Sequence, residues 1–213
     1  MLAYIITVVA AYFLGSIPTG YLAARAKGID IRTVGSGNIG ATNAMRVLGK
    51  PAGICVLFLD ALKGYAAVAW VCPLLIKSFN KPEADVETLR IIAGMAAVLG
   101  HNFTCWLKFK GGKGVATTAG VFLALAPLAV GIALVAFILA VWLTRYVSIG
   151  SIAAAIALPV TVWCLPEHNL FLGSMTTALA AMAIYKHKSN IKRLMAGTES
   201  RIGQKPEMQE PTK

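Results

Sequence analysis

The stretch Val115–Trp142, VATTAGVFLALAPLAVGIALVAFILAVW, decides the fold, because two arrangements of the chain diverge there. One crossing of a membrane takes about 20 helical residues, and this run has 28. Pro127 stands near its middle, where a proline removes a backbone donor and clashes with the preceding turn. The run is therefore one long crossing or two short helices, Val115–Ala126 and Leu128–Leu143, each below the usual spanning length.

The positions of Lys and Arg favour two helices, since cytoplasmic loops of membrane proteins collect these residues. With two helices, sixteen of the twenty Lys and Arg residues share one side, in segments 25–50, 108–113, 145–148 and 186–213. With one crossing, Arg145 and the basic C-terminus change sides and the asymmetry largely disappears. We therefore predict an all-α integral membrane protein with seven transmembrane helices, its N-terminus outside and its C-terminus in the cytoplasm.

The composition also indicates a membrane protein. The chain has 213 residues, 57% hydrophobic and 14% charged, with a mean hydropathy of +0.70 and a net charge of +11. A soluble domain of this length would carry more charge. The other predicted spans are Leu2–Ala24, Ala52–Ile76, Leu89–Leu107, Ile149–Leu165 and Leu170–Tyr185. We expect one membrane-embedded domain over residues 1–199 and a polar, frayed tail over residues 200–213.

Three polar strings interrupt the apolar chain, and the predicted topology places all of them on the cytoplasmic side. They are Gly35–Asn43 with Arg46, Lys110–Gly114, and His187–Arg193. In the first string, glycines let backbone N–H groups converge on an anion, and Arg46 supplies a two-pronged donor for phosphate. The string matches a dinucleotide fingerprint literally, but that motif needs a strand before it and this string follows a membrane span.

The second and third strings also carry anion-binding chemistry. Lys113 between glycines precedes a helix that begins at Val115, and a helix N-terminus attracts anions. A plain positive-inside cluster explains Lys108 and Lys110 better than it explains Lys113. In the third string, His187 and Asn190 share a helix face, which a lipid-headgroup-binding segment would not require.

For four other titratable residues, the sequence gives weaker evidence of a function. His101 closes a predicted helix, where a histidine more often caps than catalyses. Asp60 and Lys63 stand three residues apart inside a span, which predicts an ion pair, or a supporting role beneath Arg46. His168 lies on the predicted outer side, and we expect no function from it.

The strings together resemble a known family. The patterns G-S-G-N-x-G-A-T-N-x-x-R, H-x11-K with F-K-G-G-K-G-V-A-T, and H-x-x-N-I-x-R-L followed by G-T-E resemble the bacterial acyl-phosphate:glycerol-3-phosphate acyltransferase (PlsY) family, in order and spacing. The resemblance implies an inner-membrane enzyme that moves an acyl group from acyl phosphate to the 1-hydroxyl of glycerol 3-phosphate. The products would be lysophosphatidic acid and phosphate, with no cofactor, no metal and no acyl-CoA.

The resemblance and the residues together give a candidate site. The expected catalytic residues are His187, Asn190, Ser36, Lys113 and Arg46. The expected substrate-binding residues are Gly37, Asn38, Gly40, Thr42, Asn43, His101, Gly111, Gly112, Gly114, Arg193 and Glu199. Two phosphates ~5 Å apart repel by roughly 3 kcal/mol per pair of charges at a dielectric of about 20, so fixed cations must offset the repulsion. The expected partners are the two substrates and the lipid bilayer, not nucleic acid.

Two other functions remain open from the residues alone. A transporter for a small anion would need charges near the middle of the membrane, and only Asp60 and Lys63 lie away from the ends of the predicted spans. A non-catalytic membrane subunit would use its basic face to bind an acidic partner. The gathering of the polar strings on one side counts against the transporter, and activity of the purified chain alone would exclude the subunit.

Overall fold

The computed structural model describes residues 1–78, 86–166 and 169–203, and within these ranges every regular element is a helix. The α-helices are α1 (Leu2–Ser16), α2 (Thr19–Arg25), α3 (Ala41–Leu48), α4 (Lys50–Ala66), α5 (Cys72–Ser78), α6 (Val86–Asn102), α7 (Val115–Leu125), α8 (Pro127–Thr144), α9 (Val147–Cys164), α10 (Leu170–Lys186) and α11 (Lys188–Met195). A π-helical turn, Ala67–Val71, joins α4 to α5, and a 3₁₀ turn, Cys105–Leu107, follows α6. His168 and residues 204–213 of the expected tail lie outside the described residues.

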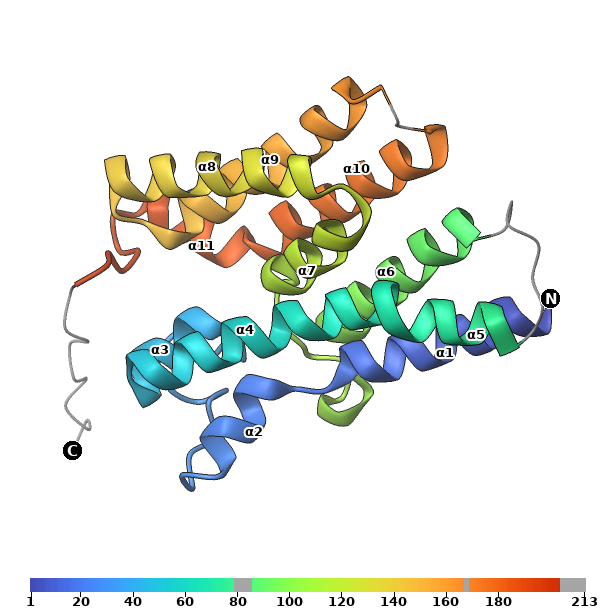
Figure 1. The fold of residues 1–213 in the computed structure, drawn as a ribbon. Coiled ribbons are helices and arrows are strands. Elements are labelled where there is room, and N and C mark those ends of the chain that lie inside the picture. The colour runs from blue at the N-terminus through green and yellow to red at the C-terminus, as the bar shows by residue number, and fades with distance from the viewer. Residues whose placement is uncertain (79–85, 167–168, 204–213) are drawn as a thin grey trace.

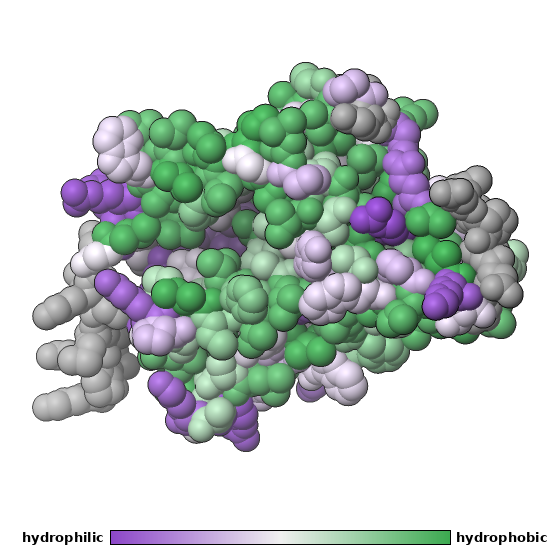
Figure 2. Space-filling model, viewed as in Figure 1, coloured by the Kyte–Doolittle hydropathy of each residue, from purple (hydrophilic) through white to green (hydrophobic). Residues whose placement is uncertain are grey.

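The helices form two layers with α7 between them (Figure 1). One layer holds α1, α3, α4, α5 and α6, and the other holds α8 to α11. Helix α1 packs on α6, α4 on α7, α3 on α4, and α9 on both α8 and α10. The face of the molecule seen in Figure 2 is mostly hydrophobic.

Four helical stretches are long and apolar enough to cross a membrane, judged by length and composition. They are Leu2–Arg25, Lys50–Ser78, Pro127–Thr144 and Val147–Cys164, while α7 and α10 are shorter apolar helices. These stretches confirm the integral membrane class that the composition predicted.

The decisive stretch Val115–Trp142 is two helices, as the charge distribution predicted. Helix α7 ends at Leu125, and Ala126 leaves the helical conformation with φ −148° and ψ 73°. Pro127 then begins α8, where its missing N–H costs nothing because the first turn of a helix has no partner for it. Arg90 supports the break, since its guanidinium donates to the Ala124 carbonyl near the end of α7 at 2.8 Å.

The first predicted span, Leu2–Ala24, is interrupted between Ile17 and Pro18, which the sequence analysis did not anticipate. Pro18 ends α1 and leaves nearby carbonyls without their helical partners. Thr104 donates to the Ser16 carbonyl at 2.6 Å, and Lys63 donates to the Ile17 carbonyl at 2.9 Å. The break is therefore stabilised by side chains from two other helical segments.

The expected tail starts with ordered contacts. The Arg201 guanidinium donates to the Tyr146 hydroxyl at 3.0 Å, and the Ile202 amide donates to the Arg145 carbonyl at 2.9 Å. These contacts hold residues 201–202 against the turn between α8 and α9. Our division of the chain at residue 199 remains an expectation.

The contact between α4 and α7 depends on small residues. A Cβ at Gly120 would lie 1.8 Å from the Ala61 carbonyl oxygen, so the two backbones touch there. We predict that Gly120→Ala lowers the midpoint of thermal unfolding in detergent by several degrees, because overpacking costs roughly 1–3 kcal/mol. Gly131→Ala is the matched control, since nothing lies within 4 Å of a Cβ there. Equal midpoints for the two variants would contradict the close α4–α7 contact.

Candidate anion-binding site

The Asn43 side chain shapes the first polar string. Its amide nitrogen donates to the carbonyls of Ile31, Val34 and Asn38 at 2.9–3.2 Å, and its oxygen accepts the Ser36 amide at 2.8 Å. The side chain is 1% exposed. All its bonds go to the loop that precedes α3, so Asn43 organises this loop.

The same loop directs the start of α3 into the site. The Asn38 oxygen accepts the Gly40 amide at 2.9 Å, and α3 then begins at Ala41. The first hydrogen bonds within this helix run from Asn43 and Ala44 to the Gly40 carbonyl. The amides of the first helical turn have no partner within a helix, so Ala41 and Thr42 present free N–H groups.

The second polar string packs against the end of α6. The Gly111 amide donates to the Asn102 carbonyl at 3.2 Å, and the Gly112 amide donates to the His101 carbonyl at 3.0 Å. A Cβ at Gly111 would lie 2.0 Å from that His101 oxygen. These two amides therefore fix the loop, whereas we expected them to bind substrate.

After the two packed glycines, the second string contains Lys113 and leads into the N-terminus of α7. Gly114 adopts φ +81° and precedes α7, whose first residues, Val115 and Ala116, line a cavity. The Lys113 ammonium donates to the Asn190 side-chain oxygen. The second and third strings are therefore in direct contact.

The third polar string forms a chain of hydrogen bonds. The Asn190 nitrogen donates to Glu199 at 2.6 Å, and the Arg193 guanidinium donates to the other oxygen of Glu199 at 2.6 Å. Burial alone would raise the pKa of Glu199, but the hydrogen bonds from Asn190 and Arg193 hold it below its usual value. Glu199 therefore stays ionised and fixes both donors.

His187 stands at the junction of α10 and α11 and is 2% exposed. Its Nδ1 lies 2.8 Å from the Ala183 carbonyl, which can only accept, so Nδ1 carries the proton and Nε2 is an acceptor. Burial and the nearby charge of Lys113 lower the pKa of His187 to about 4. At neutral pH the ring is therefore uncharged.

Three cations of the site, Arg46, Lys113 and Lys186, form no ion pair with a carboxylate among the described residues. Burial lowers the pKa of Lys113 to about 8; Glu199 opposes this effect, and the charges of Arg193 and Arg46 add to it. Burial also lowers the pKa of Arg46, although a guanidinium keeps its charge in proteins. Positive charge crowded into a partly buried space favours the binding of an anion.

Two adjacent cavities lie between the polar strings, and Figure 2 shows a hollow between the two helical layers. The larger has a volume of about 140 Å³, the smaller about 110 Å³. Their shared wall consists of Ser36, Asn38, Lys113 and Asn190. The larger cavity adds apolar side chains, Leu57 and Phe137, while the smaller adds Lys186, Ser189 and Arg193.

The cavities collect nearly all the expected site residues. The larger is lined by Ser36, Asn38, Gly40, Thr42, Asn43, Arg46, His101, Lys113, Gly114, His187, Asn190 and Glu199, and the smaller adds Gly37 and Arg193. Only Gly111 and Gly112 of the expected set line neither cavity. Among the described residues, no group of three or more His, Cys, Asp or Glu side chains is placed to hold a metal ion.

The start of α9 was not predicted from the sequence, and it brings Val147, Ser148 and Ser151 to the larger cavity. Three helix N-termini, those of α3, α7 and α9, thus line one space, and none has an acidic residue in its first turn. Each N-terminus carries roughly half a positive charge. Ser148 and Ser151, spaced three apart just after Arg145, were the available signal.

Apolar helices around two cation-lined cavities define a membrane protein with a site for phosphate-sized anions. The sequence model described as glycerol-3-phosphate acyltransferase matches residues 5–197. The chain belongs to the glycerol-3-phosphate acyltransferase family. It is 46% identical to the glycerol-3-phosphate acyltransferase of Geotalea daltonii, over 94% of this chain and 98% of the relative, and 49% identical to that of Geobacter sulfurreducens, over 95% and 99%.

Solved structures of an integral membrane glycerol 3-phosphate acyltransferase, PlsY (YgiH), have the same fold. The glycerol 3-phosphate form superposes with a TM-score of 0.84 and 39% identity, over 94% of this chain and 96% of that one. The lysophosphatidic acid form gives 0.80 and 38%, over 94% and 95%.

The loop geometry predicts that substitutions at two asparagines change hydrogen–deuterium exchange in this loop to different extents. Asn43→Asp removes a donor that three carbonyls share and places a charge against them, so hydrogen–deuterium exchange across residues 31–40 should rise strongly. Asn38→Asp is the control, because an aspartate keeps the oxygen that accepts the Gly40 amide, and exchange should stay near the wild-type level. If Asn43→Asp leaves the loop protected, Asn43 does not organise it.

Proposed function

We propose that this protein transfers an acyl group from acyl phosphate to the 1-hydroxyl of sn-glycerol 3-phosphate, giving lysophosphatidic acid and inorganic phosphate. The observation that carries the proposal is the pair of adjacent anion-attracting cavities with Lys113 and Asn190 in their common wall. A reaction between two phosphate-bearing molecules needs such a pair. Family membership and the glycerol 3-phosphate and lysophosphatidic acid forms of the similar structure support the acceptor and the product.

We assign the larger cavity to the acyl phosphate. Its apolar wall includes Leu57 of α4 and Phe137 of α8, so an acyl chain could pass between these helices into the bilayer. Arg46, Thr42 and the free amides of α3 would hold the donor phosphate. The smaller cavity is mostly polar and adds Lys186, Ser189 and Arg193, which suits a water-soluble acceptor.

Direct attack suffices, because acyl phosphate already carries a good leaving group. The acceptor hydroxyl attacks the carbonyl carbon, the bond to the phosphate oxygen breaks, and phosphate leaves. The Ser36 hydroxyl would stabilise the charge that develops on the carbonyl oxygen. No Ser or Cys nucleophile is required.

The proton of the acceptor hydroxyl has two possible destinations, His187 Nε2 and a substrate phosphate. The pKa of His187 is about 4, whereas the second pKa of a phosphate ester is about 6. A phosphate ester in water is therefore a stronger base than the buried His187 ring. We therefore infer that His187 orients the hydroxyl through Nε2 and that a phosphate oxygen accepts the proton.

We propose seven crossings, with α1–α2 and α4–α5 each acting as one span, and with the site facing the cytoplasm of a bacterial inner membrane. We also propose one domain over residues 1–199. Single cysteines in place of the exposed Lys50 and Lys188 should react with an impermeant thiol reagent from the same side of the membrane. Reaction from opposite sides would disprove this topology.

The function is tested by phosphate release from palmitoyl phosphate upon addition of glycerol 3-phosphate, with purified protein in detergent and no added metal. Arg46→Ala and Lys113→Ala should each lower kcat/KM by at least about 100-fold, since each removes a partly buried charge from the phosphate sites. Lys110→Ala is the matched control, an exposed lysine of the same string, and should remain within about threefold.

Three outcomes of this assay count against parts of the proposal. No phosphate release by the wild-type protein would refute the function, and flux of glycerol 3-phosphate across liposomes without phosphate release would favour a transporter. If Arg46→Ala raises KM for glycerol 3-phosphate and not for palmitoyl phosphate, the assignment of the two cavities is reversed.

The pKa of Lys113 predicts an alkaline limit to activity. Because this pKa is lowered to about 8, the ammonium is charged below that pH and loses its charge as the pH rises through it. We expect kcat/KM to fall above about pH 8. Lys113→Arg should move this limit beyond pH 10 if it retains activity, because a guanidinium stays charged. An unchanged alkaline limit in that variant would assign the limit to another group.

A further inference from the structure

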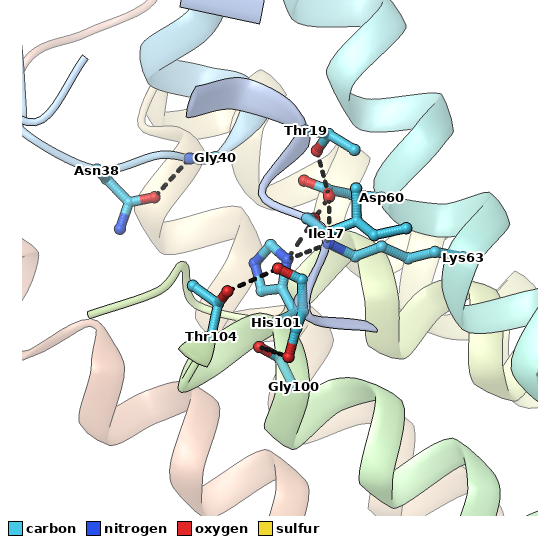
Figure 3. Close-up of polar contacts among 10 residues, drawn as sticks. Ile17, Thr19, Asn38, Gly40, Asp60, Lys63, Gly100, His101 and Thr104 are labelled. Carbon is cyan, nitrogen blue, oxygen red and sulfur yellow. Dashed lines mark hydrogen bonds and ion pairs between the residues drawn. The ribbon is translucent and has the colours of Figure 1, made fainter. Parts of the chain in front are cut away.

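Asp60, Lys63 and His101 form a buried polar cluster between α4 and α6, and the reaction proposed above does not use it. Their side chains are 2%, 5% and 6% exposed. Thr19, at the start of α2, donates to Asp60 Oδ1 at 2.6 Å, as Figure 3 shows. Both Asp60 and His101 line the larger cavity, so the cluster borders the space assigned to substrate.

Counting the donors at Asp60 fixes the protonation of Lys63. Its Nζ lies 2.8 Å from Asp60 Oδ1, 2.9 Å from the Ile17 carbonyl and 3.0 Å from His101 Nδ1. Asp60 Oδ1 also accepts from the Thr19 hydroxyl, and a buried carboxylate that takes two donors needs a cation as one of them. Lys63 is therefore an ammonium paired with the Asp60 carboxylate.

This count also fixes the form of His101. Since Lys63 can only donate, Nδ1 of His101 must accept, and the proton of the neutral ring then sits on Nε2. A charged imidazolium would need an acceptor at Nδ1. The nearest carboxylate oxygen, Asp60 Oδ1, is 3.6 Å away, which is too long for a hydrogen bond.

The position of the ring directs Nε2 toward the site. A Cβ at Gly112 would lie 2.2 Å from Nε2, so this nitrogen lies beside the loop that presents Lys113. In Figure 3 it points away from Lys63, to the side on which Asn38 and Gly40 lie. Those two residues line the same cavity as His101.

We propose that His101 is a neutral hydrogen-bond donor whose Nε2–H binds an anionic oxygen of the substrate in the larger cavity. This inference rests on the proposed function. Lys63 and Asp60 act as positioning residues, because they hold Nδ1 as an acceptor and leave the proton on Nε2. A neutral imidazole can stabilise negative charge in this way without giving up its proton.

The two histidines of the site would then have opposite roles. His187 gives its Nδ1–H to the Ala183 carbonyl and presents a bare nitrogen. His101 accepts at Nδ1 and presents an N–H. One neutral ring faces the acceptor hydroxyl, and the other faces anionic oxygen.

The tautomers can be observed directly. Nitrogen-15 NMR of histidine-labelled protein in detergent at pH 7 should show His101 protonated on Nε2 and bare on Nδ1, and His187 the reverse. His101→Gln and His187→Gln assign the signals. Titration with inorganic phosphate should shift the His101 Nε2–H resonance downfield. A His101 ring protonated on both nitrogens, or only on Nδ1, would overturn the proposal, as would no response at saturating phosphate.

Kinetics separate a donor from a packing residue. His101→Gln can place an amide N–H near the Nε2 position and should keep kcat/KM within about tenfold of wild type. His101→Leu should lose roughly 100-fold or more, and His168→Leu is the matched control. Equal losses in Gln and Leu variants that remain folded would make His101 structural and refute the donor role.

The kinetic constants also identify the oxygen involved. A loss in kcat alone assigns the bond to the oxyanion of the attacked carbonyl, and a rise in KM for palmitoyl phosphate assigns it to the donor phosphate. If the wild-type protein released no phosphate in the assay, the proposed function would fail, while the NMR tautomers and the phosphate titration would still decide the state of His101.

Discussion

The structure depends on satisfying backbone groups that helix breaks leave exposed in an apolar environment, where water is not available to bind them. At the carbonyl ends of broken helices, protein cations supply the missing donors. Lys63 donates to the Ile17 carbonyl at the end of α1, Arg90 to the Ala124 carbonyl near the end of α7, and Lys186 to the Asn102 carbonyl at the end of α6. These three contacts account for charged residues that would otherwise be costly within apolar helices.

Three helix N-termini show the opposite pattern, because no acidic side chain is placed at them. The starts of α3, α7 and α9 face the larger cavity, and none has an acidic residue in its first turn. The protein thus supplies hydrogen-bond donors to the carbonyl ends of α1, α6 and α7. It leaves the backbone amides at the starts of α3, α7 and α9 for a ligand. A phosphate has the charge and the acceptor oxygens to complete them, so the fold and the proposed chemistry have one physical basis.

Much of this site could be predicted from the sequence. For side chains such as Arg46, Lys113 and Asn190, the residue type alone gives the charge and the hydrogen-bonding groups. The break at Pro127 was also predictable, since charge asymmetry supported it. The start of α9 was missed because backbone N–H groups have no residue signature of their own. The break at Pro18 was missed because Leu2–Ala24 is continuously apolar, and the contacts that stabilise it come from Lys63 and Thr104, distant in sequence. Gly111 and Gly112 were expected at the ligand because a glycine required for close packing looks the same in sequence as one required for anion binding.

Two carboxylates can line a site for anions because each is paired with a cation. Asp60 is neutralised by Lys63 and Glu199 by Arg193, so neither adds net repulsion toward a phosphate. Arg46, Lys113 and Lys186 remain as side-chain charges at the two cavities, and three helix ends each add roughly half a charge. Together these come close to the roughly four negative charges of two phosphate groups. The site is thus balanced when both substrates are bound. When it is empty, the charges of Arg193 and Arg46 add to the effect of burial in lowering the pKa of Lys113.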